Sequence, residues 1–150
     1  MIKYQLFLLF AVNQFCFTSA ACPSHWMRFA NNCYLFVIRY PLDWINAMTF
    51  CKAYRAKLAE VKSASENNFL QHEARRLKGS FWLGATDVIM EGTWRWISTD
   101  TILSYSAWLP KQPDNHESKE HCLHLLNTYQ SKWNDVACDK KFNFICEKSA

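Results

Sequence analysis

The sequence predicts one α+β domain in which two helices pack on small antiparallel β-sheets. Apolar residues recur at helical spacing in two segments between residues 43 and 79. Short segments rich in aromatic and β-branched residues then follow up to residue 147, which is typical of strands. Half of the 150 residues are hydrophobic, so a single domain of this length can bury a core and disorder is not expected.

The beginning of the chain has the layout of a secretory signal peptide. Lys3 precedes an apolar run from Leu6 to Phe17, and small residues follow this run. The run is too short to span a bilayer, and no later segment approaches about 20 consecutive apolar residues. We therefore expect a signal peptide at residues 1–21, a domain at residues 22–150, and a chain that is secreted without membrane insertion.

Removal of that segment leaves an even number of cysteines, which suits disulfides in an oxidising compartment. The remaining cysteines are Cys22, Cys33, Cys51, Cys122, Cys138 and Cys146. Their number alone allows about fifteen pairings. A zinc site built from cysteines is a poor alternative because the sequence has no paired Cys-x-x-Cys spacing.

The first elements after the leader are a strand and a helix. Residues 33–39 are rich in aromatic and β-branched side chains, which predicts a strand that Pro41 ends. Asp43 can then cap a helix. The buried stripe of this helix would consist of Trp44, Ala47, Met48, Cys51 and Tyr54.

A second helix begins near Ser63 or Ser65. Ser63 and Glu66 have the spacing of a capping box, and Gly79 ends the helical pattern. Its buried stripe would consist of Leu70, Ala74 and Leu77. Two helices are thus expected before most of the sheet.

Short strands are expected after the second helix, at residues 81–86, 93–97, 121–126, 136–138 and 142–147. The longest irregular span, residues 98–120, carries many acidic and amide side chains. An irregular loop of more than about fifteen residues in a compact domain is usually functional or disordered. Because these side chains suit metal binding, we interpret the loop as functional.

Two short runs, residues 108–122 and 133–138, offer oxygen ligands. Amide oxygens come from Gln112, Asn115 and Asn134, and carboxylates come from Asp114, Glu120 and Asp135. A flexible loop that supplies six to eight oxygens favours Ca²⁺ over Mg²⁺. The alternative is that the three acids are ordinary solvated side chains of a loop.

The same residues carry a resemblance to a known family. Gln112, Pro113 and Asp114, then Glu120 two residues before a cysteine, then Trp133, Asn134 and Asp135, resemble the calcium-dependent carbohydrate-recognition domain of C-type lectins. Further matches are Trp82, Leu83, Gly84 and Ala85, then Trp94, and the cysteine spacing. The resemblance covers nearly all of residues 22–147. It implies a C-type lectin-like fold with a long calcium-binding loop region.

The resemblance also implies covalent and metal connections. It pairs Cys22 with Cys33, Cys51 with Cys146, and Cys122 with Cys138. It implies that one Ca²⁺ and the hydroxyls of a sugar are bound together by Gln112, Asp114, Glu120, Asn134 and Asp135. It further implies a cis peptide bond before Pro113, whereas most X-Pro bonds are trans.

An auxiliary calcium position of the family matches Asp87 and Glu91, with Asn115 as a third ligand. His121 stands where the family often has a carboxylate, so this site is expected to be weak, and Asp87 and Glu91 alternatively serve as surface acids. His121 and His124 do not make a zinc pair, because residues three apart on a strand face opposite sides.

Lectins that resemble the Gln112, Pro113, Asp114 motif prefer galactose or N-acetylgalactosamine. Strong galactose binders usually have an aromatic residue just after the motif, whereas residues 115–119 here are Asn, His, Glu, Ser and Lys. We therefore expect relaxed selectivity, with His116 as the nearest candidate sugar contact. A mannose-type, N-acetylglucosamine-type or broad specificity is the alternative among lectins.

The resemblance implies a soluble lectin that recognises microbial or cell-surface glycans in innate immunity, and not an enzyme. One shallow site binds weakly, so non-covalent homo-oligomers would add avidity. A formal charge of +4 without a dense basic cluster does not indicate nucleic-acid binding. One rival function is a protein- or mineral-binding module with the same fold. A hydrolase is disfavoured because the sequence lacks a nucleophile elbow and paired histidine ligands.

Overall fold

The structure is a computed structural model that describes residues 21–150, so the predicted signal peptide lies almost entirely outside the described residues. The elements in chain order are β1 (Met27–Phe29), β2 (Asn32–Leu42), α1 (Trp44–Ala53), β3 (Lys57–Leu58), α2 (Ala64–Leu77), β4 (Phe81–Thr86), β5 (Arg95–Trp96), β6 (Thr101–Ile102), η1 (His116–Ser118), β7 (Cys122–Leu125), η2 (Tyr129–Ser131), β8 (Trp133–Val136) and β9 (Phe142–Ser149). The predicted α+β class is confirmed. Within residues 21–150, neither helix has the length and apolar character needed to cross a membrane.

Both helices begin at the residues that the sequence indicates. The Asp43 side chain caps α1 by accepting a hydrogen bond from the Asn46 main chain at 3.0 Å. The Ser63 hydroxyl caps α2 by accepting from the Glu66 main chain at 3.2 Å. The left-handed residue that ends α2 is Lys78, one position before the predicted glycine. These caps satisfy main-chain donors that a helix leaves free at its first turn.

The strands form one mixed sheet, whereas the sequence predicts small antiparallel sheets. The central pair is antiparallel, with β2 alongside β9. β4 pairs with β9 in parallel and with β7 in antiparallel fashion, and so connects the two halves of the molecule. Parallel pairing requires a long connection between the strands. The whole loop region lies in the chain between β4 and β9 and forms this long connection.

β2 is longer than the sequence predicts. It runs through Pro41 to Leu42, and its register against β9 shifts between Val37 and Leu42. Proline donates no main-chain hydrogen bond, so it is tolerated in strands at bulges and edges. The prediction that Pro41 ends this strand is therefore wrong, because the irregularity absorbs it.

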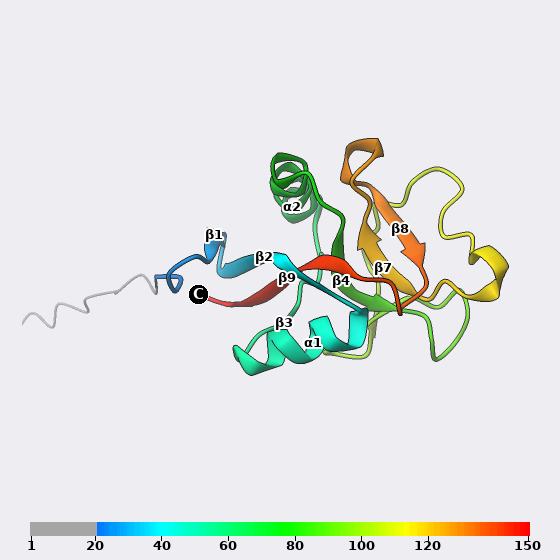
Figure 1. Ribbon diagram of the computed structural model, residues 1–150, viewed down its shortest axis with the longest axis horizontal. Coiled ribbons are helices and arrows are strands. Elements are labelled where there is room, and N and C mark those ends of the chain that lie inside the picture. The colour runs from blue at the N-terminus through cyan, green and yellow to red at the C-terminus, as the bar shows by residue number, and fades with distance from the viewer. Residues whose placement is uncertain (1–20) are drawn as a thin grey trace, which may run out of the picture.

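The two helices lie on opposite sides of the sheet (Figure 1), and each packs on one of two buried hydrophobic clusters. Successive residues of β4 divide between them, since side chains alternate along a strand: Trp82 packs in the cluster of α1 and Leu83 in that of α2. The loop region between β5 and β8 projects at the end of the molecule opposite to the C-terminus (Figure 1). The candidate site thus stands on a rigid, two-sided scaffold.

Three disulfides pair the cysteines in the way that the resemblance implies: Cys22 with Cys33, Cys51 with Cys146, and Cys122 with Cys138. The second bridge joins α1 to β9 and closes a loop of 95 residues, which the chain-entropy view associates with about 4–5 kcal/mol. The third joins the start of β7 to the segment after β8. It therefore holds the two ends of the candidate site together.

Candidate functional site

Strand β8 positions the centre of the candidate site. It pairs with β7 so that Asn134 lies opposite His124 and Asp135 lies opposite Leu123. Because side chains alternate along a strand, Asp135 shares a face with the core residue Trp133, and both are fully buried. Asn134 points to the other face. A buried carboxylate requires partners, and the loop that precedes β7 supplies them.

Asp135 fastens the long loop to β8. Its Oδ1 accepts a hydrogen bond from the Asp114 main chain at 3.3 Å, and its Oδ2 accepts from the Asn115 main chain at 2.7 Å. The Asn115 side chain in turn accepts from the Glu120 main chain at 3.0 Å. Residues 114–120 are thereby folded into a tight turn over the end of β8. The sequence indicates these residues as ligands, but their structural role in holding the loop emerges only from the fold.

Three carboxylates converge at this turn. One oxygen each from Asp114, Glu120 and Asp135 lies within 4.8 Å of the other two. Among residues 21–150, Glu120 accepts one long hydrogen bond, from the His116 main chain at 3.3 Å. The structure therefore brings together the three acids that the sequence singles out.

The electrostatics of the cluster favour a bound positive charge. Burial raises the pKa of Asp135 above its usual value, and the neighbouring Asp114 carboxylate adds to this despite the main-chain donors. Burial also raises the pKa of Glu120, with further contributions from the Asp135 and Asp114 charges. A raised carboxyl pKa means that the site disfavours its own negative charge. A divalent cation would reverse that effect.

The amide residues of the predicted site line a shallow cleft beside the carboxylates. Gln112 and Asn134 face this cleft together with Leu109, Pro110 and Leu126. The Gln112 side chain oxygen accepts from the Asp114 main chain at 3.1 Å. The peptide bond between Gln112 and Pro113 is cis, as the resemblance implies. Gln112 and Asn134 thus line one cleft, and the Gln112 side chain is linked to the carboxylate cluster through the main chain of Asp114.

His124 is a site residue that the sequence does not reveal. Burial lowers its pKa to about 4, so the ring is neutral at physiological pH. Its Nε2 lies 3.2 Å from the Asn134 amide nitrogen, which also donates to the main-chain oxygen of Asp135. With both amide hydrogens engaged, the Asn134 Oδ1 is the atom left to meet a ligand. Only the register of β7 against β8 could have indicated this contact.

The candidate sugar contact His116 is exposed at the tip of the turn. Its side chain retains 73% of its accessible surface, and its ring lies 3.9 Å from the Glu117 carboxylate. It belongs to η1, the short helical turn that precedes Glu120. Its position is therefore accessible to a ligand above the carboxylates.

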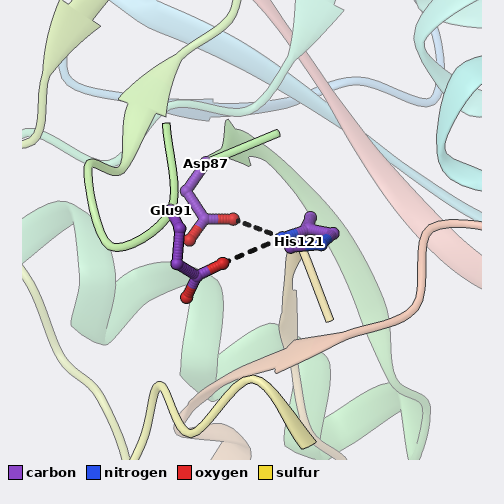
Figure 2. A group of neighbouring side chains, drawn as sticks. All are labelled: Asp87, Glu91 and His121. Carbon is purple, nitrogen blue, oxygen red and sulfur yellow. Dashed lines mark hydrogen bonds and ion pairs between the residues drawn. The ribbon is translucent and has the colours of Figure 1, made fainter. Parts of the chain in front are cut away.

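The auxiliary position forms a second cluster. Asp87 and Glu91 both face His121, whose Nδ1 lies 3.1 Å from Asp87 and 3.4 Å from Glu91 (Figure 2). Asn115, the third residue predicted for this position, directs its oxygen to the Glu120 main chain. His121 lies one residue before β7 and contacts Asp87 and Glu91, whereas His124 lies within β7 and contacts Asn134. The donor atoms here differ in kind from the all-oxygen set around Asp135.

The donor chemistry of the first cluster fits calcium. Gln112, Asp114, Glu120, Asn134 and Asp135 offer carboxylate and amide oxygens, which are the ligands that a hard divalent cation prefers. Three ionised carboxylates carry three negative charges, which balance the two positive charges of the ion and leave a net charge of −1. A site with these properties can hold a cation and, around it, a ligand rich in hydroxyl groups.

Comparisons with known proteins agree with this reading of the fold. Residues 40–148 match the lectin C-type domain family. C-type lectin domain family 4 member M of Pan troglodytes is 35% identical over 130 residues, which are 86% of this chain and 28% of that protein. The chain spans between 28% and 38% of the length of this relative and others like it. The galactose-specific lectin nattectin of Thalassophryne nattereri is 32% identical over 87% of this chain and 82% of its own length.

Solved structures show the same similarity. The mouse scavenger receptor C-type lectin carbohydrate-recognition domain superimposes with a TM-score of 0.80 and 33% identity, over 86% of this chain and 98% of that one. A herring type II antifreeze protein superimposes with a TM-score of 0.77 and 30% identity, over 86% of this chain and 99% of its own. The fold is thus shared by proteins whose names indicate different ligands.

Proposed function

The chain belongs to the C-type lectin domain family, and from this premise we propose that it binds carbohydrate in a calcium-dependent manner. C-type lectin domains are generally binding modules and not enzymes, and we propose binding without catalysis for this chain. The preferred ligands would be glycans with terminal galactose or N-acetylgalactosamine. The observation that carries the proposal is the convergence of Asp114, Glu120 and Asp135 within 4.8 Å.

Three like charges at this separation repel one another. Burial raises the pKa values of Asp135 and Glu120, and the neighbouring carboxylates add a smaller contribution. Such an arrangement is unfavourable for stability by itself. A bound cation would offset the repulsion, so the convergence of three carboxylates is explained better by cation binding than by loop structure alone. Asp135 holds the turn in place with its main-chain contacts, so the cluster is preorganised for the ion.

We assign Gln112, Asp114, Glu120, Asn134 and Asp135 as the calcium ligands. When bound, the ion would supply a positive charge and open coordination positions for a pair of neighbouring sugar hydroxyls. The side chains of the chain itself accept from and donate to those hydroxyls. His124 holds the Asn134 amide so that its oxygen faces the ligand, and His116 stands at the rim where a sugar ring can contact it.

Two observations support the galactose preference. The first is the Gln112, Pro113, Asp114 motif, and the second is the similarity to nattectin, which is named a galactose-specific lectin and matches this chain over 82% of its own length. The loop after the motif lacks an aromatic residue, because residues 115–119 are Asn, His, Glu, Ser and Lys. An aromatic ring would stack on the apolar face of galactose. Because residues 115–119 contain no aromatic residue of this kind, we expect weak binding of single sugars.

For the whole protein we propose secretion, directed by the leader at residues 1–21, and soluble recognition of microbial or cell-surface glycans in innate immunity. A single shallow site gives low affinity, so non-covalent homo-oligomers would be needed for avidity. The six cysteines of residues 22–150 are all paired within the chain. Covalent oligomers through these residues are therefore not expected.

The test is retention of the mature protein on immobilised galactose in calcium, followed by elution with chelator. Asp135→Asn should abolish retention, because it removes the buried carboxylate at the centre of the cluster. Glu117→Gln is the matched control, since Glu117 lies in the same loop but pairs with Lys119 at 3.2 Å, outside the cluster. An Asp135→Asn protein that still elutes only with chelator would contradict the proposed site.

A second candidate function is binding of a protein or mineral surface by the same fold. The observation in its favour is the similarity to a herring antifreeze protein at 30% identity. The oxygen ligands do not separate the two candidates by themselves, because a solved relative of the same fold is named a Ca²⁺-dependent antifreeze protein. Calcium binding without binding to any glycan would favour this second candidate.

A further inference from the structure

The cluster of Asp87, Glu91 and His121 differs chemically from the site around Asp135. Its donors are two carboxylates and one imidazole ring, and one ligand atom from each lies within 4.8 Å of the others. Calcium binds six to eight oxygen atoms and gains little from a nitrogen. Imidazole together with carboxylate is instead a donor set that suits zinc and related transition-metal ions.

The distances in this cluster match those of a tetrahedral metal site. The His121 Nδ1 lies 3.1 Å from an Asp87 oxygen and 3.4 Å from a Glu91 oxygen (Figure 2). In tetrahedral zinc sites with bonds of about 2.0–2.1 Å, neighbouring ligand atoms are about 3.3 Å apart. The imidazole nitrogen therefore has the spacing of such a site from both carboxylates, and the two carboxylate oxygens lie within 4.8 Å of each other.

The surrounding main chain holds Asp87 and the backbone of His121 in these positions, while the Glu91 side chain is exposed. Asp87 is 2% exposed, and its second oxygen accepts from the Gly92 main chain at 2.8 Å. The main-chain oxygen of His121 accepts from the Thr86 hydroxyl at 2.6 Å and from the Asp87 main chain at 3.3 Å. Hydrogen bonds of this kind, made by the ligating residues to their surroundings, orient the ligands of metal sites.

Without a metal, a single Nδ1–H of His121 would have to be shared between the Asp87 and Glu91 carboxylates. The Nδ1 atom carries at most one hydrogen, yet it faces two carboxylates at similar distances. A neutral ring with its lone pair at Nδ1 would face both negative charges without any attraction. A divalent cation between the three donors accepts the nitrogen lone pair and neutralises both carboxylates at once.

We propose that Asp87, Glu91 and His121 bind one divalent transition-metal ion of the Zn²⁺ class, separate from the calcium site. A fourth position remains open to water, as is usual for zinc held by three protein ligands. The site links the segment after β4 to the residue that follows Glu120. Bound zinc would therefore hold the base of the calcium-binding turn in place. Zinc binding would not require that a sugar is bound.

The experiment uses the mature protein, freed of metal with chelator and then saturated with calcium so that the oxygen site is filled. Titration with ZnCl₂ against a chromophoric chelator should show one zinc per chain. His121→Ala should lower zinc affinity by more than the roughly 10- to 100-fold that loss of an outer contact produces. Cobalt added instead of zinc should give the intense visible absorption of a tetrahedral nitrogen- and oxygen-ligated ion, and this band should vanish in His121→Ala.

His72→Ala is the matched control, because His72 also lies 3.0 Å from a carboxylate, Glu73, whose other oxygen is occupied by Arg76 at 2.7 Å. This variant should bind zinc like the original protein. His121→Asp restores an all-oxygen set and should exchange zinc binding for a second calcium, which excludes misfolding as the cause of the loss. No zinc in the calcium-saturated protein, or equal losses in the His72 and His121 variants, would overturn the proposal.

Discussion

Replacing Asp114 by asparagine should have opposite effects on stability with and without calcium. Within residues 21–150 the Asp114 carboxylate accepts no hydrogen bond, and its oxygen lies within 4.8 Å of those of Glu120 and Asp135. Its main effect in the absence of metal is therefore repulsion. Asparagine keeps the size of the side chain and removes the charge.

The size of this effect follows from Coulomb's law. Two unit charges 4.8 Å apart repel by about 0.9 kcal/mol in water and by about 3.5 kcal/mol at an effective dielectric constant of 20. Asp114 is exposed, so the value for water applies to each of its two neighbours, and salt reduces it further. The Asp114→Asn protein should be about 1–2 kcal/mol more stable than the original in chelator, a rise in Tm of roughly 4–8 °C.

In calcium the original protein should be more stable than the Asp114→Asn protein. At a concentration of about 100 times Kd, a ligand stabilises the folded state by about 2.7 kcal/mol. If loss of a carboxylate weakens binding by about 100-fold, the same concentration stabilises the variant by only about 0.4 kcal/mol. Thermal unfolding in calcium and in chelator measures both effects, and Glu117→Gln should change neither by more than about 0.5 kcal/mol. If the variant is less stable than the original in chelator, the Asp114 charge is not repulsive there; if it gains the full calcium shift, Asp114 is not a calcium ligand.

Three further predictions concern the surroundings of the site. His124→Phe keeps the ring but removes the acceptor that orients Asn134, so calcium affinity measured by titration should fall about 10- to 100-fold while the fold persists. Burial raises the pKa of Glu147 from 4.5 to about 7, so the stability linked to this proton is complete below about pH 4.5 and is lost as pH rises towards 7. Denaturant unfolding of the metal-free protein across that range should show the loss, and Glu147→Gln should flatten it. Gly84→Ala should destabilise the chain by about 1–3 kcal/mol in the same assay, because its Cβ would lie 2.8 Å from the Leu58 carbonyl oxygen.

The sequence predicts those features of the fold that depend on neighbouring residues. Asp43 and Ser63 act as helix caps through contacts only three residues away, and such local signals are readable in a sequence. The parallel pairing of β4 with β9 is not readable, because it depends on residues about 60 positions apart. The passage of β2 through Pro41 likewise depends on a register shift against a distant strand.

In the candidate site, too, some features can be predicted from the sequence and others depend on the fold. The chemistry of Asp114, Glu120 and Asp135 indicates a cation from the sequence alone, and the structure brings these residues together. The contacts of His124 with Asn134 and of His121 with Asp87 require the pairing of strands that the sequence does not specify. Positions of oxygen ligands can thus be predicted from residue types, whereas the groups that orient them cannot.

A glycan array probed with the mature protein in calcium and again in chelator measures calcium-dependent sugar binding. Binding to glycans with terminal galactose or N-acetylgalactosamine should appear in calcium and disappear in chelator. Calcium-dependent binding to mannose-type glycans instead would retain the lectin and show that the loop after Asp114 overrides the motif. The absence of any calcium-dependent glycan signal would contradict the account and favour a module for protein or mineral surfaces.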